Sequence, residues 1–204
     1  MTQTYKEQFK EAIERTRDWD LLWYEPPMMS DYRLDVTELK TAVMEYYRES
    51  RCSWEEVVGQ CFRHCVEFHD RWFFSKRIPP TITIGDVLID GEPKYGVDED
   101  VLKRELEAGN RPEEDVVTHA WLTFPDYTIL DFTVKPSEAW RKRKRKMRLS
   151  ESLTILHPKT KNSHYSYHPL LVGDKYIRSV MNLAMRDERL VEFIRMMNLE
   201  LADK

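Results

Sequence analysis

Cysteine, histidine and aspartate occur in three short segments whose residue types together suit nucleophilic catalysis. The segments are Gly-Gln-Cys-Phe-Arg-His-Cys at 59–65, Thr-His-Ala-Trp-Leu at 118–122 and Ile-Leu-Asp-Phe-Thr at 129–133. A thiol is mostly protonated at neutral pH, and a neighbouring imidazole that takes its proton yields the reactive thiolate. A carboxylate on the other ring nitrogen fixes the imidazole tautomer and stabilises its positive charge. The sequence therefore offers Cys61 as nucleophile, His119 as base and Asp131 as orienting group.

The geometry of the second and third segments depends on strand register. The residues around His119 and Asp131 indicate two strands, 116–124 and 127–134. A three-residue connecting loop would pair His119 directly with Asp131 on one face of a hairpin, with their Cβ atoms about 5 Å apart. A two-residue loop would instead place Asp131 opposite Ala120, on the other face. The sequence leaves both registers open.

The three segments resemble those of the transglutaminase-like (papain-like) cysteine enzyme superfamily. There a His-Ala-Trp strand is followed by a strand ending in Asp-Pro-Thr or Asp-Leu-Thr, and the nucleophilic Cys lies earlier, at the start of a helix. The resemblance covers residues 59–134 and includes the chain order Cys61, His119, Asp131. It implies a cysteine-dependent hydrolase or acyltransferase that forms a thioester with an amide or peptide-type acyl group. It also implies a protein or peptide substrate and no cofactor.

Two further residues are candidates for contact with the substrate. Gln60 lies beside the backbone N–H of Cys61, and the two groups are candidate donors to a developing oxyanion. Trp121 follows His119 by two residues and is either a core residue or a platform for substrate.

The position of Cys61 within its helix is an open point. Ser53-Trp54-Glu55-Glu56 has the capping-box pattern of a helix start, and a helical pattern continues to about residue 74. In the superfamily the nucleophile lies at a helix N-terminus, so the helix would have to break near Gly59 and restart. If the helix does not break, Cys52 is the better-placed thiol.

The cysteines also raise the possibility of a metal site. The chain has an odd number of cysteines, namely Cys52, Cys61 and Cys65, and so does not have the pattern of a disulfide framework. Cys61, Cys65 and His69 fall along one helix face, with His64 nearby. Ligands on one straight helix do not surround a tetrahedral ion, and no Cys-x2-Cys pair is present. We therefore expect no metal.

A basic strip suggests a different function. The strip consists of Arg141, Lys142, Arg143, Lys144, Arg145, Lys146 and Arg148. The rest of the chain has 25 basic against 36 acidic residues, a net charge of −11. An acidic body with one basic strip favours local contact with nucleic acid or an acidic protein, and a solvated surface is the simpler alternative. Trp140 and the Tyr and His residues at 164–168 could add stacking contacts. A non-enzymatic binding or adaptor protein is therefore the alternative function.

The elements that must position these residues follow the order helices, strands, helix. Helices are predicted at 4–24, 35–51, 53–74 and 98–108, strands at 81–90, 116–124, 127–134 and 153–156, a helix or coil at 139–149, a loop at 157–169, and one or two helices at 174–201. This order predicts an α+β fold with N-terminal helices, a small, mainly antiparallel sheet carrying the His and Asp strands, and a C-terminal helix. We expect one domain over 1–204: a helical segment (1–52), a core (53–156) with an insertion at 91–115, and a loop and helix (157–204).

Composition excludes some classes of protein. With 41% hydrophobic and 12% aromatic residues, the chain is too apolar for wholesale disorder. No apolar run approaches the roughly 20 residues that span a bilayer, and residues 1–7 have no apolar signal core. We therefore expect a cytoplasmic protein without membrane contact, bacterial or in the host cytoplasm if viral.

Overall fold

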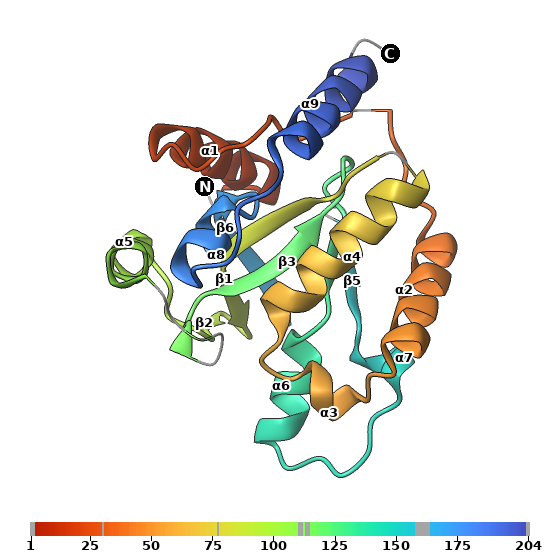
Figure 1. Ribbon diagram of the computed structural model, residues 1–204. Coiled ribbons are helices and arrows are strands. Elements are labelled where there is room, and N and C mark those ends of the chain that lie inside the picture. Colours follow the sequence, from red (N-terminus) through yellow and green to blue (C-terminus); the bar gives the residue numbers. More distant parts are fainter. Residues whose placement is uncertain are drawn as a thin grey trace.

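The computed structural model describes residues 3–29, 31–76, 78–109, 112, 115–157 and 164–202. Its helices are α1 (Tyr5–Asp18), α2 (Val36–Ser50), α3 (Trp54–Val57), α4 (Cys61–Lys76), α5 (Glu99–Ala108), α6 (Val134–Arg141), α7 (Leu149–Ser152), α8 (Lys175–Val180) and α9 (Glu188–Ala202). Its strands are β1 (Thr81–Ile89), β2 (Glu92–Pro93), β3 (His119–Thr123), β4 (Ile129–Asp131), β5 (Thr154–Leu156) and β6 (Tyr165–Val172). Helices at both ends of the chain surround a curled antiparallel sheet, which confirms the predicted α+β class (Figure 1).

The sheet is built around the long strand β1. β1 pairs with β6 along one edge and with β3 along the other, and β4 and β5 continue the sheet beyond β3. The short β2 pairs with the end of β1 through a turn at Asp90-Gly91, where both residues have positive φ. The predicted His and Asp strands are therefore adjacent members of one sheet.

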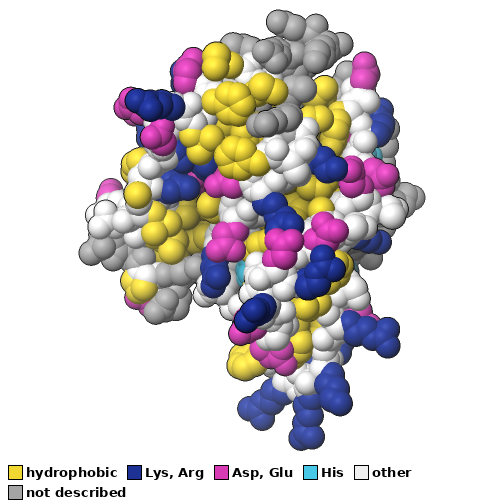
Figure 2. Space-filling view, turned by 45° about the vertical axis from the view of Figure 1, so that its right-hand side comes forward, with side chains coloured by type: hydrophobic (Ala, Val, Ile, Leu, Met, Phe, Trp, Pro, Cys, Tyr) yellow, Lys and Arg dark blue, Asp and Glu magenta, His cyan; other side chains and the backbone are white. Residues whose placement is uncertain are grey.

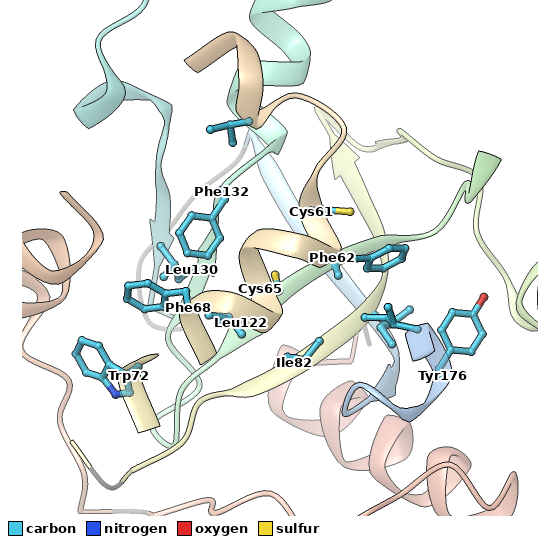
Figure 3. Close-up of a cluster of buried hydrophobic side chains, with 14 of the residues drawn as sticks. Cys61, Phe62, Cys65, Phe68, Trp72, Ile82, Leu122, Leu130, Phe132 and Tyr176 are labelled. Carbon is cyan, nitrogen blue, oxygen red and sulfur yellow. The ribbon is translucent and has the colours of Figure 1, made fainter. Parts of the chain in front are cut away.

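Helix α4 covers one face of this sheet and forms the main core with it (Figure 1). The apolar side chains of α4 recur at helical spacing, namely Phe62, Cys65, Phe68 and Trp72. They pack against Ile82, Leu122 and Leu130 of the strands, as Figure 3 shows. Each such fully buried side chain contributes about 1.5–3 kcal/mol. This packing fixes the position of α4 and of its first residue.

Helix α1 covers the opposite face. Its Phe9 and Ala12 pack against Val172 of β6, and its Tyr5 hydroxyl accepts a hydrogen bond of 2.9 Å from Nε1 of Trp121. The alternation along β3 places Leu122 towards α4 and Trp121 towards α1.

Strand β6 corrects the loop predicted at 157–169, of which residues 158–163 lie outside the described part. Its His, Ser and Pro content suggested a loop, but Tyr165 and Tyr167 alternate as in a strand. Pro169 is tolerated because the β1–β6 register shifts at Gly85, its partner. A Cβ at Gly85 would lie 2.0 Å from the backbone oxygen of His168, so only glycine fits this close approach.

The helix boundaries differ from the predictions in three places. The helix predicted at 53–74 is two helices, α3 and α4, and the one at 4–24 ends at Asp18. The chain is already helical at Val134, so α6 precedes the helix or coil predicted at 139–149. Among the described helices, none has both the length and the apolar character needed to cross a bilayer.

Candidate active site

Cys61 is the first residue of α4 because the chain breaks at Gly59. Ser53 and Glu56 form the predicted capping box of α3, which lasts only to Val57. Gly59 then adopts a φ of +74°, a left-handed conformation that glycine accepts without strain. The break at Gly59 is one of the two alternatives that the sequence left open. The N-terminus of a helix carries a partial positive charge that favours an anion, so the break places the thiol where a thiolate is stabilised.

His119 and Asp131 meet as a buried pair. Nε2 of His119 lies 2.7 Å from Oδ2 of Asp131, and both side chains are almost wholly excluded from solvent. Neither predicted register is right: Leu122 pairs with Leu130 and Thr123 with Ile129, which places Asp131 opposite Trp121 and diagonal to His119. An offset of two residues keeps His119 and Asp131 on the same face of the sheet.

The register differs because the hairpin loop is longer than either prediction. It comprises residues 124–128 and is closed by a 2.8 Å bond from Phe124 N–H to the Thr128 carbonyl. Asp126 supports this loop, because its carboxylate accepts the N–H of Thr128 at 3.0 Å and that of Leu34 at 3.1 Å. The second of these contacts comes from a segment remote in the chain.

Asp131 is held from two sides. Its Oδ2 also accepts the hydroxyl of Tyr167 at 2.9 Å, and its Oδ1 accepts the N–H groups of Thr133 and Val134 at 2.8 and 3.0 Å. Burial alone would raise the pKa of Asp131, but the charge and hydrogen bond of His119, together with these N–H donors, lower it. Asp131 is therefore a carboxylate, and Nε2 of His119 is the donor to it.

The imidazole of His119 lines the same pocket as the thiol of Cys61. Burial disfavours a charged ring, but the charge and hydrogen bond of Asp131 and a hydrogen bond with Cys61 raise the pKa of His119 to about 10. Because Nε2 is bonded to Asp131, Nδ1 is the ring nitrogen that is left for a second partner. The three predicted residues are thus brought together, with the carboxylate bonded to the imidazole and the thiol beside it on the pocket wall.

Tyr95 stacks on the free face of this imidazole, with ring centroids 4.6 Å apart and planes inclined by 8°. Asp86 holds the segment that carries Tyr95. One oxygen of Asp86 accepts the N–H of Val87 and of Tyr95, and the other accepts those of Gly96 and Val97, at 2.7–3.2 Å. Sequence reasoning missed both residues, although an aspartate inside a β-branched strand segment is a signal of a buried polar role.

A pocket of about 220 Å³ gives access to the site. Its walls are Gly59, Cys61, Phe62, Tyr95, Val116, Val117, Thr118, His119, Thr133 and Ser137. Cys61 is 8% exposed, and Val117 is 50% exposed. Buried Glu105 of α5 fixes one wall, because it accepts the N–H of Val117 at 2.8 Å and the hydroxyl of Thr118. The predicted insertion 91–115 thus contributes Tyr95 to the pocket and Glu105 behind it.

The other predicted residues lie outside the pocket walls. Trp121 has no exposed surface, so its assignment as a substrate-binding residue is wrong and the core alternative describes it. Gln60 is half-buried at the start of α4, beside Cys61. Cys52 is half-buried and donates to the Ser50 carbonyl, and Cys65 is buried in the main core.

The two histidines that could have joined the cysteines around a metal have other partners. Nδ1 of His64 is bonded to the Tyr46 hydroxyl at 2.7 Å, and Nδ1 of His69 to Asp70 at 2.8 Å. In the described ranges, no three His, Cys, Asp or Glu side chains are grouped so that they could hold a metal ion.

The basic strip is an exposed loop that joins α6 to α7. All seven of its basic residues are exposed, and Lys and Arg side chains project together at the lower end of Figure 2. Only its first residue is helical, so the coil alternative describes most of it. The hydroxyls of Tyr165 and Tyr167, expected as stacking groups in a loop, bind Glu138 and Asp131 instead.

Comparison of the chain with protein-family models, curated proteins and solved structures finds no match. The resemblance of residues 59–134 to the transglutaminase-like superfamily therefore stays a prediction, and any function assigned to the protein depends on the geometry of the site.

Proposed function

We propose that the protein is a cysteine-dependent hydrolase or acyltransferase that acts on an amide or peptide-type acyl group through a thioester. The observation that carries the proposal is the buried imidazole of His119, which is hydrogen-bonded to Asp131 at 2.7 Å and lines the same pocket as the Cys61 thiol. The position of Cys61 at a helix start, on the wall of a pocket, supports the same function.

Before the acylation step, the thiol proton of Cys61 already resides on Nδ1 of His119, and in that step the thiolate sulfur of Cys61 attacks the carbonyl carbon. The π electrons of the C=O bond move to oxygen, and the tetrahedral adduct forms. When the adduct collapses, the C–N bond breaks and the imidazolium gives its proton to the departing nitrogen. An amine leaves and a thioester on Cys61 remains.

In the deacylation step, His119 accepts a proton from water or from an acceptor amine as that nucleophile attacks the thioester. The C–S bond breaks, and the proton returns to the sulfur of Cys61. Water gives a carboxylic acid, and an amine gives a new amide. Asp131 stabilises the imidazolium in both steps, and the stacked ring of Tyr95 holds its plane.

The start of α4 supplies the oxyanion donors. The first N–H groups of a helix have no acceptor within it, and the N–H of Cys61 is one of these. A carbonyl oxygen of the bound substrate accepts this N–H as negative charge develops.

Thiol labelling tests the proposal. Iodoacetamide near pH 7, with the modified cysteine identified by peptide mapping, should label Cys61 at least about tenfold faster than Cys52, because an ordinary thiol is only a few per cent ionised. Changing His119→Asn should abolish the difference, and Cys61→Ser should leave the labelling of Cys52 unchanged. Three equally slow thiols in the folded protein would overturn the proposal.

A further inference from the structure

The basic strip is connected to the candidate active site through one short helix. α6 begins at Val134, three residues after Asp131, whose Oδ1 accepts the N–H groups of the N-cap Thr133 and of Val134. Ser137 of α6 lines the pocket, and Arg141 follows four residues later, on the same face of the helix. That spacing is about 6 Å along the axis, so the strip begins close to the mouth of the pocket.

Lys94 extends the positive charge towards the pocket. Its ammonium nitrogen is buried and, among the described residues, has no hydrogen-bond partner. It lies 5.4 Å from the ring centroid of Tyr95, a pocket wall. Burial and the charges of Arg141 and Lys142 lower the pKa of Lys94, while the charges of Glu138 and Asp131 act in the opposite direction. A buried ammonium without a hydrogen-bonded partner is costly unless an anion pairs with it.

Few of the positive charges of the strip are paired with acidic side chains of the described residues. Lys142 pairs with Glu138 at 2.9 Å, whereas no acidic side chain of the described chain pairs with Arg141, Arg143, Lys144, Arg145 or Lys146. Trp140, which directly precedes the strip, is 60% exposed and contacts Trp54 edge-to-face. An exposed aromatic side chain next to unpaired cations is a common feature of recognition surfaces.

We propose that Lys94, Arg141 and the rest of the basic strip bind acidic side chains of a polypeptide substrate whose acyl group enters the Cys61 pocket. This inference rests on the proposed function and names its substrate class. The proposed function favours an acidic peptide over nucleic acid, because the pocket that Ser137 of α6 lines would take an amide or peptide-type acyl group. A polypeptide carries such groups along its backbone, and its acidic side chains can pair with the strip.

Chloroacetylated peptides test the inference, because the electrophile reports entry into the pocket. Three probes carry four Glu, four Gln or four Lys residues after an N-terminal chloroacetyl-glycine, and the second-order rate of Cys61 labelling is measured for each at low salt. The Glu probe should label Cys61 about tenfold faster than the Gln probe, and the Lys probe should be the slowest. The preference should shrink at high salt, because added NaCl screens these charges.

Two matched variants locate the effect. In the strip variant, Arg141, Arg143, Lys144 and Arg145 become Gln, and the ratio of Glu-probe to Gln-probe rates should fall to about one. The control variant has Lys10, Lys40, Arg104 and Arg189 changed to Gln, which removes the same charge from exposed positions elsewhere. It should keep the ratio, and Lys94→Met should reduce it.

The remaining outcomes separate the two proposals. Slow labelling of Cys61 by iodoacetamide would overturn the proposed function itself. Fast labelling by iodoacetamide with equal rates for the three peptides would overturn only the acidic substrate class. The acidic substrate class would also be overturned if single-stranded or duplex oligonucleotides inhibited labelling by the Glu probe at a lower concentration than a free tetraglutamate peptide does. The strip would then be a nucleic-acid surface.

Discussion

Replacing Asp131 by asparagine should strongly reduce the reactivity of the Cys61 thiol without unfolding the protein. The amide oxygen can take the place of Oδ1, which accepts the N–H groups of Thr133 and Val134. The amide nitrogen then replaces Oδ2, the atom that faces Nε2 of His119 at 2.7 Å. Because an amide N–H donates, Nε2 must become the acceptor and the ring proton moves to Nδ1. An Nδ1–H cannot take the proton of Cys61.

The size of the effect follows from the bond that is lost. A hydrogen bond with a charged partner contributes about 1.5–3 kcal/mol, and the full burial of both partners favours the upper part of that range. Since this bond stabilises the imidazolium, its loss should slow the labelling of Cys61 by iodoacetamide about 10- to 150-fold at pH 7. The pKa of His119, about 10, means that the wild-type ring stays charged at neutral pH. The difference in Cys61 labelling rate between the wild type and Asp131→Asn should therefore persist from about pH 6 to about pH 9.

Mass spectrometry of the alkylated peptides gives the rate for each cysteine in one experiment. Cys52 is half-buried, and its thiol donates to the Ser50 carbonyl instead of to a histidine, so its labelling rate is the internal control. Circular dichroism melting checks that Asp131→Asn remains folded. A folded variant that labels Cys61 at the wild-type rate would refute the reasoning, because the carboxylate would then have no influence on the proton of the thiol.

Three further predictions concern pH, packing and the stacked ring. Burial lowers the pKa of His64 to about 4, so the free energy of unfolding should decrease by about 2–3 kcal/mol when the pH falls from about 7 to about 4.5. Urea titrations measure this loss of stability, which should be smaller in His64→Gln. The sign follows because the unfolded chain, with an ordinary pKa near 6.5, binds the proton first. Gly85→Ala should destabilise by more than about 3 kcal/mol because its Cβ meets backbone, whereas Gly59→Ala, with open space but a positive φ, should cost about 1–2 kcal/mol in the same thermal melts. Tyr95→Leu should slow the labelling of Cys61 about two- to tenfold through loss of the stacked ring, and an unchanged rate would deny that ring a positioning role.

Local rules gave the alternatives for the position of Cys61 but did not choose between them. The capping box at Ser53 and the helical pattern to about residue 74 predict one helix, whereas the structure breaks it at Gly59 and restarts it at Cys61. The 2-residue period of strands places His119 and Asp131 on one face only if the loop has odd length, and the sequence left that length open. Both inferences use only neighbours in the sequence.

The features that sequence reasoning missed depend on contacts between remote segments. The hairpin loop is long because Asp126 also holds the backbone of Leu34, and the strand β6 exists because Gly85 lets its backbone approach. Tyr95 reaches the imidazole because the carboxylate of Asp86 accepts three N–H groups of the segment predicted as an insertion, those of Tyr95, Gly96 and Val97. The partners of Asp126 and Gly85 lie far away in the sequence, and those of Asp86 lie across a turn, so local periodicity reveals neither kind of contact.

The same contacts bear on whether the buried pair of His119 and Asp131 serves stability or chemistry. A buried ion pair contributes little net stability, because desolvation of both charges offsets their attraction, and apolar side chains would fill the space as well. This fold nevertheless directs several elements onto one ring: the first turn of α6 and Tyr167 fix the carboxylate, while Tyr95 covers a face of the imidazole. The ring also lines a pocket together with a thiol at a helix start. A purely structural pair would need neither the pocket nor the thiol, and the proposed thioester chemistry accounts for both.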